Sequence, residues 1–190
     1  RTACSTAGVP HIHLGLAGEG LEDILLANAD TTRTYITKLA DVVVDQYGVN
    51  DIRNGRIFTE IRDDKISAWT NWASSGVRRI VAVSITPLPG FDTDERNDLN
   101  DWLASLTPSA VSALVGTPVD YAFVDVASAV EDGAGSNEWL NGYSDDDVHP
   151  NATGFTAIQS EMGAAIAAAI SSELPENYYF DEIATGGLVV

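Results

Sequence analysis

Several residue types that build common functional sites are scarce in this sequence. The chain of 190 residues has one cysteine, Cys4, which excludes an internal disulfide framework and a cysteine-based zinc motif. Only 10 basic residues stand against 28 acidic ones, and the formal net charge of −18 argues against nucleic acid or an anionic membrane as a partner. No apolar run reaches the roughly 18 residues that would span a membrane. The N-terminal "RTACSTAGVP" does not have the pattern of a signal peptide.

The composition is otherwise that of an ordinary globular domain. Hydrophobic residues make up 45% of the chain and charged residues 20%. A chain of this length can bury one full-sized core, so we expect a single domain. The acidic residues are dispersed and indicate a solvated surface. This balance favours an extracellular or assembly-associated location over a cytoplasmic one.

Short apolar runs alternate with helical patterns along the chain. Four runs rich in β-branched residues predict buried strands, at 10–16, 40–44, 78–85 and 120–127. Helical patterns are predicted after 20, over 58–75, around 94–106 and from Asn151 to about 172. In the last of these, a stripe at spacings of three and four predicts core positions at Phe155, Ile158, Met162, Ile166 and Ile170. The alternation predicts an α/β fold with a parallel sheet, followed from 175 to 190 by a C-terminal extension.

Three polar clusters follow the predicted strands, where α/β proteins place their working residues. They are "GLAGEG" (15–20), "YGVND" (47–51) and "SDDDVHPNATGF" (144–155). Each has an ordinary explanation as a turn or a helix cap. Each also has a chemical one, because Asn50 offers amide donors for an oxyanion and Asp146 could fix the tautomer of His149 as a general base.

Metal binding is the weaker alternative for the third cluster. Asp145, Asp146, Asp147 and His149 carry ligand atoms, but no second histidine lies nearby at ligand spacing. His11 and His13 alternate in a predicted strand, which favours packing on one face of the sheet.

Taken in order, the three clusters resemble the conserved blocks of the SGNH, or GDSL-type, hydrolases. "HLGLAGEGLEDIL" is similar to the second block, and Gly48-Val49-Asn50-Asp51 matches the G-x-N-D block in full. Asp146 and His149, followed by Pro150, match the D-x-x-H block. "ERNDLNDWL" resembles the family's helix that carries arginine and asparagine. The similarity runs from residue 8 to about 172, and it implies a three-layer α/β/α, flavodoxin-like, doubly wound sheet.

The resemblance implies a role for each matched residue. Asn50 and the backbone of Gly18 would donate to the oxyanion. His149 would take the proton of a serine nucleophile, and Asp146 would orient His149. The reaction would be hydrolysis of a small-molecule or glycan ester, and no cofactor is implied.

The family's serine-bearing block and its central first strand are absent from the sequence. Ser5, Ser84, Ser136 and Ser144 do not match that block. We therefore expect residues 1–174 to be an SGNH-like domain completed by an N-terminal segment or a partner chain that supplies the strand and the nucleophile. A permuted arrangement, with "GGLVV" in the central position, is the lesser alternative.

Two functions are compatible with this reading. The first is a serine esterase acting on carbohydrate or lipid esters, and the second is a catalytically inactive SGNH-like binding or structural module. The loops "TPLPGFDTDE" and "EDGAGSNEWLNGYSDD" are candidates to line the substrate site. Within the second loop, Trp139 and Tyr143 could stack on a sugar or simply pack against the surface.

Overall fold

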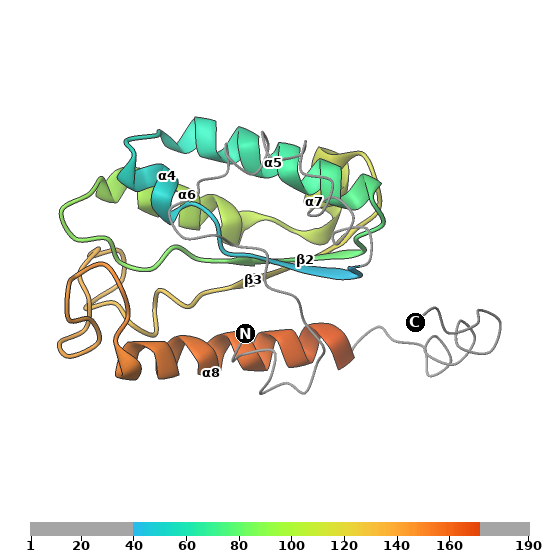
Figure 1. Cartoon of the computed structure of the whole chain (residues 1–190). Coiled ribbons are helices and arrows are strands. Elements are labelled where there is room, and N and C mark those ends of the chain that lie inside the picture. The colour runs from blue at the N-terminus through green and yellow to red at the C-terminus, as the bar shows by residue number, and fades with distance from the viewer. Residues whose placement is uncertain (1–39, 172–190) are drawn as a thin grey trace, which may run out of the picture.

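Three strands form one parallel sheet in the computed structural model, which describes residues 40–171 (Figure 1). The strands are β1 (Val42–Asp45), β2 (Arg79–Val83) and β3 (Asp120–Val124). β2 lies in the middle, with Ile80 opposite Val43 on one side and Tyr121 on the other. All five residues of β2 are buried, and its apolar run Ile80–Val83 is typical of a strand covered on both faces.

The strands predicted at 40–44, 78–85 and 120–127 are confirmed, each with a shorter ladder than the apolar run. Residues 84–85 and 125–127 leave the sheet and begin loops. Those loops, with the turn after β1, carry most of the polar residues discussed below. The strand predicted at 10–16 lies outside the described residues.

Five helices are described between and after the strands. They are α4 (Val49–Arg53), α5 (Phe58–Ser74), α6 (Thr93–Ser105), α7 (Pro108–Val115) and α8 (Ala152–Ser171). The helices expected over 58–75, near 94–106 and after Asn151 are confirmed as α5, α6 and α8. The short α4 and α7 were not predicted. For α7 the local signals were present, because Thr107 caps the helix, Pro108 occupies its first turn and Gly116 ends it at φ 71°.

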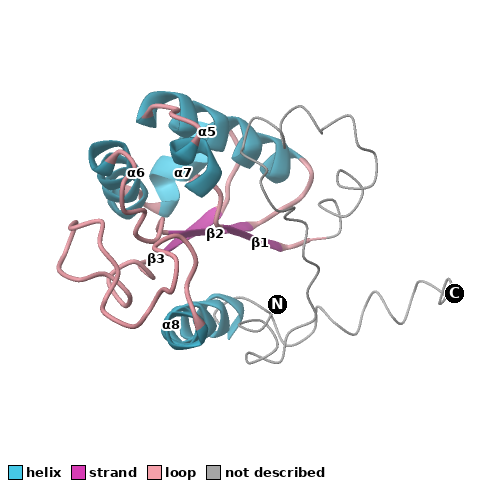
Figure 2. Ribbon diagram, turned by 60° about the vertical axis from the view of Figure 1, so that its left-hand side comes forward, coloured by secondary structure: helices cyan, strands magenta, loops and turns pink. Residues whose placement is uncertain are grey.

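The helices lie in two layers, one on each face of the sheet. α5, α6 and α7 cover one face and α8 covers the other (Figure 2). Parallel strands joined by helices, with both faces covered, make the fold α/β with three layers, as predicted.

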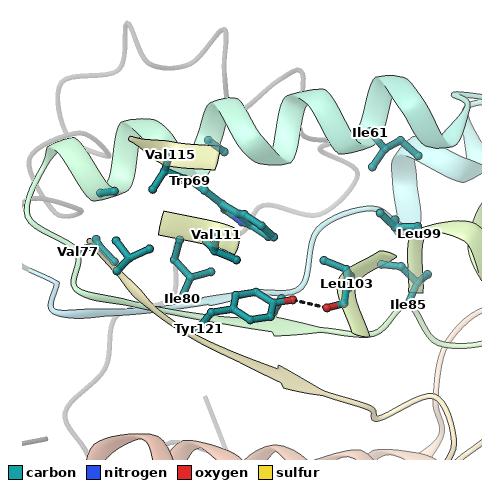
Figure 3. Packing of buried hydrophobic residues seen from close by; sticks show 14 of the residues in the cluster. Ile61, Trp69, Val77, Ile80, Ile85, Leu99, Leu103, Val111, Val115 and Tyr121 are labelled. Carbon is teal, nitrogen blue, oxygen red and sulfur yellow. Dashed lines mark hydrogen bonds between the residues drawn. The ribbon is translucent and has the colours of Figure 1, made fainter. Parts of the chain in front are cut away.

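The larger core cluster lies between the sheet and α5, α6 and α7 (Figure 3). Trp69 is fully buried there and stacks on Trp102, with ring centroids 5.5 Å apart. Tyr121 reaches from β3 into the same layer, and its hydroxyl donates to the Leu103 carbonyl at 2.7 Å. Burial raises the pKa of Tyr121, and the carboxylate of Asp45 raises it further.

The second core cluster lies between the sheet and α8. One of the core positions predicted for this helix is wrong. Ile158 and Ile166 are buried as expected, whereas Phe155 is 46% exposed. The buried face of the first turn passes through Gly154 instead. A Cβ added to Gly154 would come within 2.4 Å of the Tyr143 carbonyl oxygen, so the helix approaches the preceding loop at this residue too closely for a side chain.

Other predictions fall outside the described residues. These concern Cys4, Ser5, His11, His13, Gly18, the helix after residue 20 and the C-terminal extension at 175–190.

Candidate functional site

The carboxyl ends of the three parallel strands lie at one edge of the sheet. The turn into α4 follows β1, a loop at 84–92 follows β2, and a long loop at 125–151 follows β3. All three leave toward the same side of the molecule (Figure 1). This common edge holds the described part of the candidate site.

The turn that presents Asn50 is held close to the core. Gly48 precedes α4 at φ 132°, and a Cβ there would come within 2.9 Å of the Ile85 side chain. A larger residue would therefore be strained and would also collide with the loop after β2. Asn50 is the second residue of α4 and is half-buried. The G-x-N-D motif is thus a tight strand-to-helix turn.

Two buried carboxylates brace this turn. Asp45 accepts hydrogen bonds from the Lys65 ammonium at 2.9 Å, from the Trp69 indole at 2.7 Å and from the backbone N–H of Tyr47 at 3.1 Å. Asp51 pairs with Arg56 at 2.9 Å. These contacts fix both ends of the segment that carries Asn50.

His149 and Asp146 are in direct contact. The imidazole Nδ1 lies 2.8 Å from Asp146 Oδ2, and the side chains are 72% and 54% exposed. Asp146 Oδ1 also accepts the backbone N–H groups of Val148, at 3.0 Å, and His149, at 2.7 Å. The hydrogen bond with the His149 side chain is the main cause that lowers the pKa of Asp146, and the two backbone bonds lower it further.

This geometry sets the chemistry available to the histidine. When an ionised carboxylate accepts from Nδ1–H, the neutral imidazole keeps Nε2 free of its proton. The exposed ring can then accept a proton from a bound reactant. The geometry is that of a general base oriented by a carboxylate.

Asp146 and His149 are called the dyad below, and residues 144–151, which carry them, the dyad loop. Hydrogen bonds join the two ends of this loop. Ser144 and Pro150 form an isolated antiparallel bridge, and the Ser144 hydroxyl donates to the His149 carbonyl at 2.8 Å. The Asn151 amide donates to Asp145 at 2.9 Å, and its oxygen caps α8 by accepting the N–H groups of Thr153 and Gly154. The loop and the helix start are therefore one unit.

The side chains of Trp139 and Tyr143 do not form an open surface on which a sugar could stack. Trp139 is only 8% exposed and belongs to the core cluster against α8. Tyr143 is half-buried and packs against the same cluster. Their burial favours the packing alternative, and stacking on a sugar stays a prediction.

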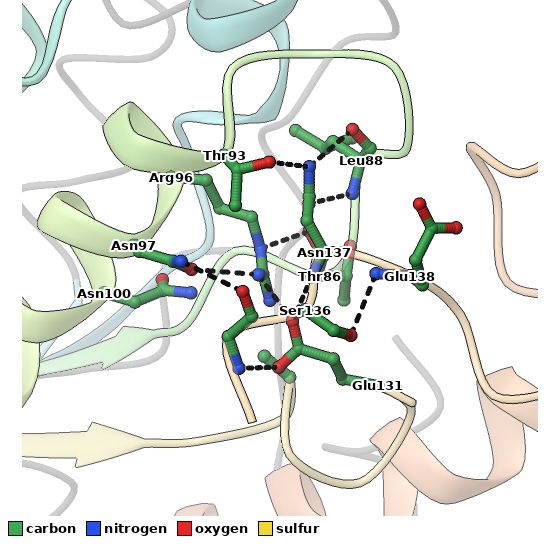
Figure 4. Close-up of polar contacts among 12 residues, drawn as sticks. Thr86, Leu88, Thr93, Arg96, Asn97, Asn100, Glu131, Ser136, Asn137 and Glu138 are labelled. Carbon is green, nitrogen blue, oxygen red and sulfur yellow. Dashed lines mark hydrogen bonds and ion pairs between the residues drawn. The ribbon is translucent and has the colours of Figure 1, made fainter. Parts of the chain in front are cut away.

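A buried polar network joins the loops after β2 and β3 (Figure 4). Arg96, which is 1% exposed, donates to Glu131 at 2.6 Å and to the Ile85 carbonyl at 3.1 Å. Glu131 also accepts the backbone N–H of Asn137 at 2.8 Å. The Asn137 side chain bonds both the N–H and the C=O of Leu88, at 2.7 and 2.9 Å. The two loops predicted to line the substrate site are thus fixed to each other.

Glu131 and Asn137 were not singled out from the sequence. Arg96 was noted only through the family resemblance. One signal was available, because Arg96 shares a helix face with Leu99 and Leu103, and a cation on an apolar face needs a buried partner. Nothing in the spacing indicated which of the many acids would be that partner.

Two further searches concern residues 40–171 alone. In that part of the chain no three His, Cys, Asp or Glu side chains gather as a metal site would require. Nor does that part contain a helix with the length and apolarity to cross a membrane.

Comparison with known proteins places this fold. No family model matches the chain, and no curated protein matches it in sequence. Among solved structures, a protein assigned to the G-D-S-L lipolytic family from Desulfitobacterium hafniense superposes with a TM-score of 0.62 at 14% identity, covering 87% of this chain and 84% of the other. A GDSL-like lipase from Bacteroides thetaiotaomicron superposes with a TM-score of 0.58 at 18% identity, covering 88% and 80%.

A further similar structure is a carbohydrate esterase of family 3 from Talaromyces cellulolyticus. It has a TM-score of 0.58 at 20% identity, and the match covers 87% of this chain and 77% of the other. The chain therefore has the fold of the GDSL, or SGNH, hydrolases.

Proposed function

We propose that the chain is an ester hydrolase that uses the SGNH mechanism. The observation that carries this proposal is the contact between Asp146 Oδ2 and His149 Nδ1, at 2.8 Å, on an exposed loop beyond the carboxyl ends of the strands. The similar structures include proteins described as a lipase and a carbohydrate esterase, which supports an ester substrate.

In the proposed reaction, His149 Nε2 takes the proton of a serine hydroxyl as its oxygen attacks the ester carbonyl. The tetrahedral oxyanion accepts hydrogen bonds from the Asn50 side chain and the backbone N–H of Gly18. His149 then gives the proton to the leaving alcohol. Water attacks the acyl-enzyme with His149 again as base, and the acid is released with the serine restored.

The nucleophile is proposed to come from outside residues 1–190, either from an N-terminal segment or from a partner chain. The described serines that were considered have other hydrogen bonds. The Ser84 hydroxyl is buried and donates to Asp125 at 3.1 Å, and Ser144 donates to the His149 carbonyl. Ser136 accepts the Glu138 N–H at 3.2 Å.

The substrate is proposed to be a small-molecule or glycan ester bound beside the loops at 86–95 and 131–146. The network of Arg96, Glu131 and Asn137 joins these loops through buried hydrogen bonds. Such preorganisation reduces the entropy lost when substrate binds.

The test is hydrolysis of p-nitrophenyl acetate by the full-length protein that includes this chain and any partner chain. Asp146→Asn and His149→Gln should each lower kcat by about 10³–10⁴-fold, as for other oriented histidine bases. Asn50→Ala should lower it by about 10²–10³-fold. Asp63→Asn, an equal charge change at an exposed residue of α5 outside both loops, is the matched control.

A fluorophosphonate probe should label one serine in the same protein. Labelling would locate the nucleophile, and Asp146→Asn should slow it. Absence of both hydrolysis and labelling would contradict the proposed activity and favour a binding module.

A further inference from the structure

Trp139 makes one polar contact from its buried position, and that contact is to the dyad loop. The indole Nε1–H donates to the Asp147 carbonyl at 3.1 Å. The ring is 8% exposed and lies in the core cluster between the sheet and α8. An indole N–H in such a place needs an acceptor, and here the acceptor is the backbone between Asp146 and His149.

The peptide group that accepts from Trp139 also donates to the Asp146 carboxylate. Its carbonyl belongs to Asp147 and its N–H to Val148, and that N–H lies 3.0 Å from Asp146 Oδ1. Asp146 Oδ2 in turn contacts His149 Nδ1 at 2.8 Å. The indole therefore donates to the peptide group, the peptide group donates to the carboxylate, and the imidazole Nδ1–H donates to the same carboxylate. The first two bonds run in one direction through the peptide group, and such bonds polarise and align one another.

The backbone conformation next to this peptide group is one that needs support from other contacts. Asp147 has φ 60°, in the left-handed region that non-glycine residues adopt at a cost. The bonds of Ser144 and Asn151 tie the ends of the loop. The Trp139 indole contacts its middle, at the Asp147 carbonyl.

Trp139 is itself rigidly placed. It forms an isolated antiparallel bridge with Glu131, and the Leu140 N–H donates to the Val130 carbonyl at 2.8 Å. Glu131 is locked by Arg96 at 2.6 Å. The indole is thus a fixed donor on a different segment from the dyad loop it contacts.

We propose that Trp139 is a positioning residue that orients the Asp146 carboxylate, and through it the His149 imidazole, by fixing the 147–148 peptide group. Its effect on rate rests on the proposed hydrolase function. Its effect on the imidazole does not, so the two can be tested separately.

The kinetic test is Trp139→Phe in the full-length protein, which keeps an apolar ring and removes the N–H. We expect kcat to fall about ten- to hundredfold, the usual loss when a group supporting a functional side chain is removed, with KM within about twofold. Trp72→Phe removes an indole from the half-buried face of α5, far from the dyad in sequence, and should leave both constants unchanged.

The second test needs no activity. In a long-range proton–nitrogen NMR spectrum, taken where imidazole is neutral and assigned with His149→Gln, the wild-type His149 should carry its proton mainly on Nδ1. Trp139→Phe should shift the tautomer population toward Nε2–H, and Trp72→Phe should not.

Folding losses are separated from positioning by a closer isostere. Benzothienylalanine at position 139 keeps the shape of the indole and replaces its N–H with sulfur, so it should reproduce both the kinetic and the spectroscopic change. An unchanged tautomer population in this variant and in Trp139→Phe would overturn the inference. A changed tautomer in a protein without hydrolase activity would keep the inference and overturn the proposed function.

Discussion

The Asp146 carboxylate accepts several hydrogen bonds from the protein although its side chain is exposed. Four donors from its own loop, namely the imidazole, two backbone N–H groups and the Ser144 hydroxyl at 3.4 Å, converge on its two oxygens. The donors favour the ionised form, which is why the pKa of Asp146 lies below its usual range. These donors therefore favour the ionised carboxylate in one orientation, as the proposed role of His149 as a general base requires.

This lowered pKa predicts a pH-dependent contribution to stability. An unperturbed aspartate has a pKa of about 3.9. The folded-state pKa of Asp146 lies below this unfolded-state value. The ionised carboxylate therefore contributes its full stabilisation at pH values above the unfolded-state pKa. The stabilisation shrinks as the pH falls below the unfolded-state pKa, and it is lost as the pH falls through the folded-state pKa. The difference in free energy of unfolding between the wild type and Asp146→Asn should therefore be smaller near about pH 3 than at neutral pH.

Urea unfolding at the two pH values measures this difference. His149→Gln removes the main cause of the shift, so in its background the Asp146→Asn effect should depend less on pH. A wild-type advantage that stays constant or grows as the pH falls would contradict the assignment.

At this scale, residue spacing predicted contacts within a loop better than contacts between segments. Asp146 and His149 are three residues apart, and a turn readily brings such a pair together. Trp139 contacts the Asp147 carbonyl, and Asp147 has a left-handed φ of 60°. An aspartate at this position did not by itself predict that conformation. The core position predicted at Phe155 is wrong. In the first turn of α8 the buried residue is Gly154, which lies against the Tyr143 carbonyl, so the predicted apolar stripe does not extend into this turn.

Among the elements, α6 connects the core to the site. Its Leu99 and Leu103 fill the core, while Arg96 on the same face reaches Glu131 in the loop after β3. Asn100, also on α6, brackets Ile85 by accepting its N–H at 2.7 Å and donating to its carbonyl at 3.0 Å. One helix thus fixes the start of one loop and the middle of another.

Breaking this connection should be costly. Arg96→Met leaves the carboxylate of Glu131, whose side chain is 5% exposed, without its cation, and it removes a donor to the Ile85 carbonyl. Loss of one partner from a buried ion pair costs about 3–5 kcal/mol. Chemical unfolding should show a loss in that range, and hydrogen exchange should show faster exchange at the Gly135 and Asn137 amides, which donate to Glu131.

Arg62→Met is the matched control, since Arg62 pairs with Asp63 on the surface, where the side chains are 35% and 64% exposed. An exposed pair contributes about 0–1 kcal/mol. Equal losses in the two variants would show that the network around Arg96 is not what holds the loops.

The elements themselves were largely predictable because their signals are local. Near-continuous apolar runs predicted the described strands, and helical spacing of apolar residues predicted the three longest helices. α4 was missed because the G-x-N-D segment indicates a turn, and the helix there has only five residues. The partners of Arg96 could not be predicted, since 35 residues separate it from Glu131 and only the folded loops bring them together.

For the molecule as a whole, alternation of strands and helices predicted the topology and the edge where the polar clusters gather. Parallel strands bring their carboxyl ends to one side, which is why segments after β1 and β3 share an edge (Figure 1). The charge distribution is also a property of the whole chain. With a formal net charge of −18, most carboxylates have no cation with which to pair.

That imbalance predicts the effect of salt on stability. Added salt screens attraction and repulsion alike, but exposed pairs contribute little, and repulsion among the excess carboxylates destabilises the compact state. The Debye length shortens from about 30 Å at 0.01 M to about 3 Å at 1 M, so screening of that repulsion should dominate. Urea unfolding in increasing sodium chloride should show a rising free energy of unfolding. Tetramethylammonium chloride at matched ionic strength controls for specific cation binding, and a free energy that falls in both salts would show that attractive pairs outweigh the repulsion.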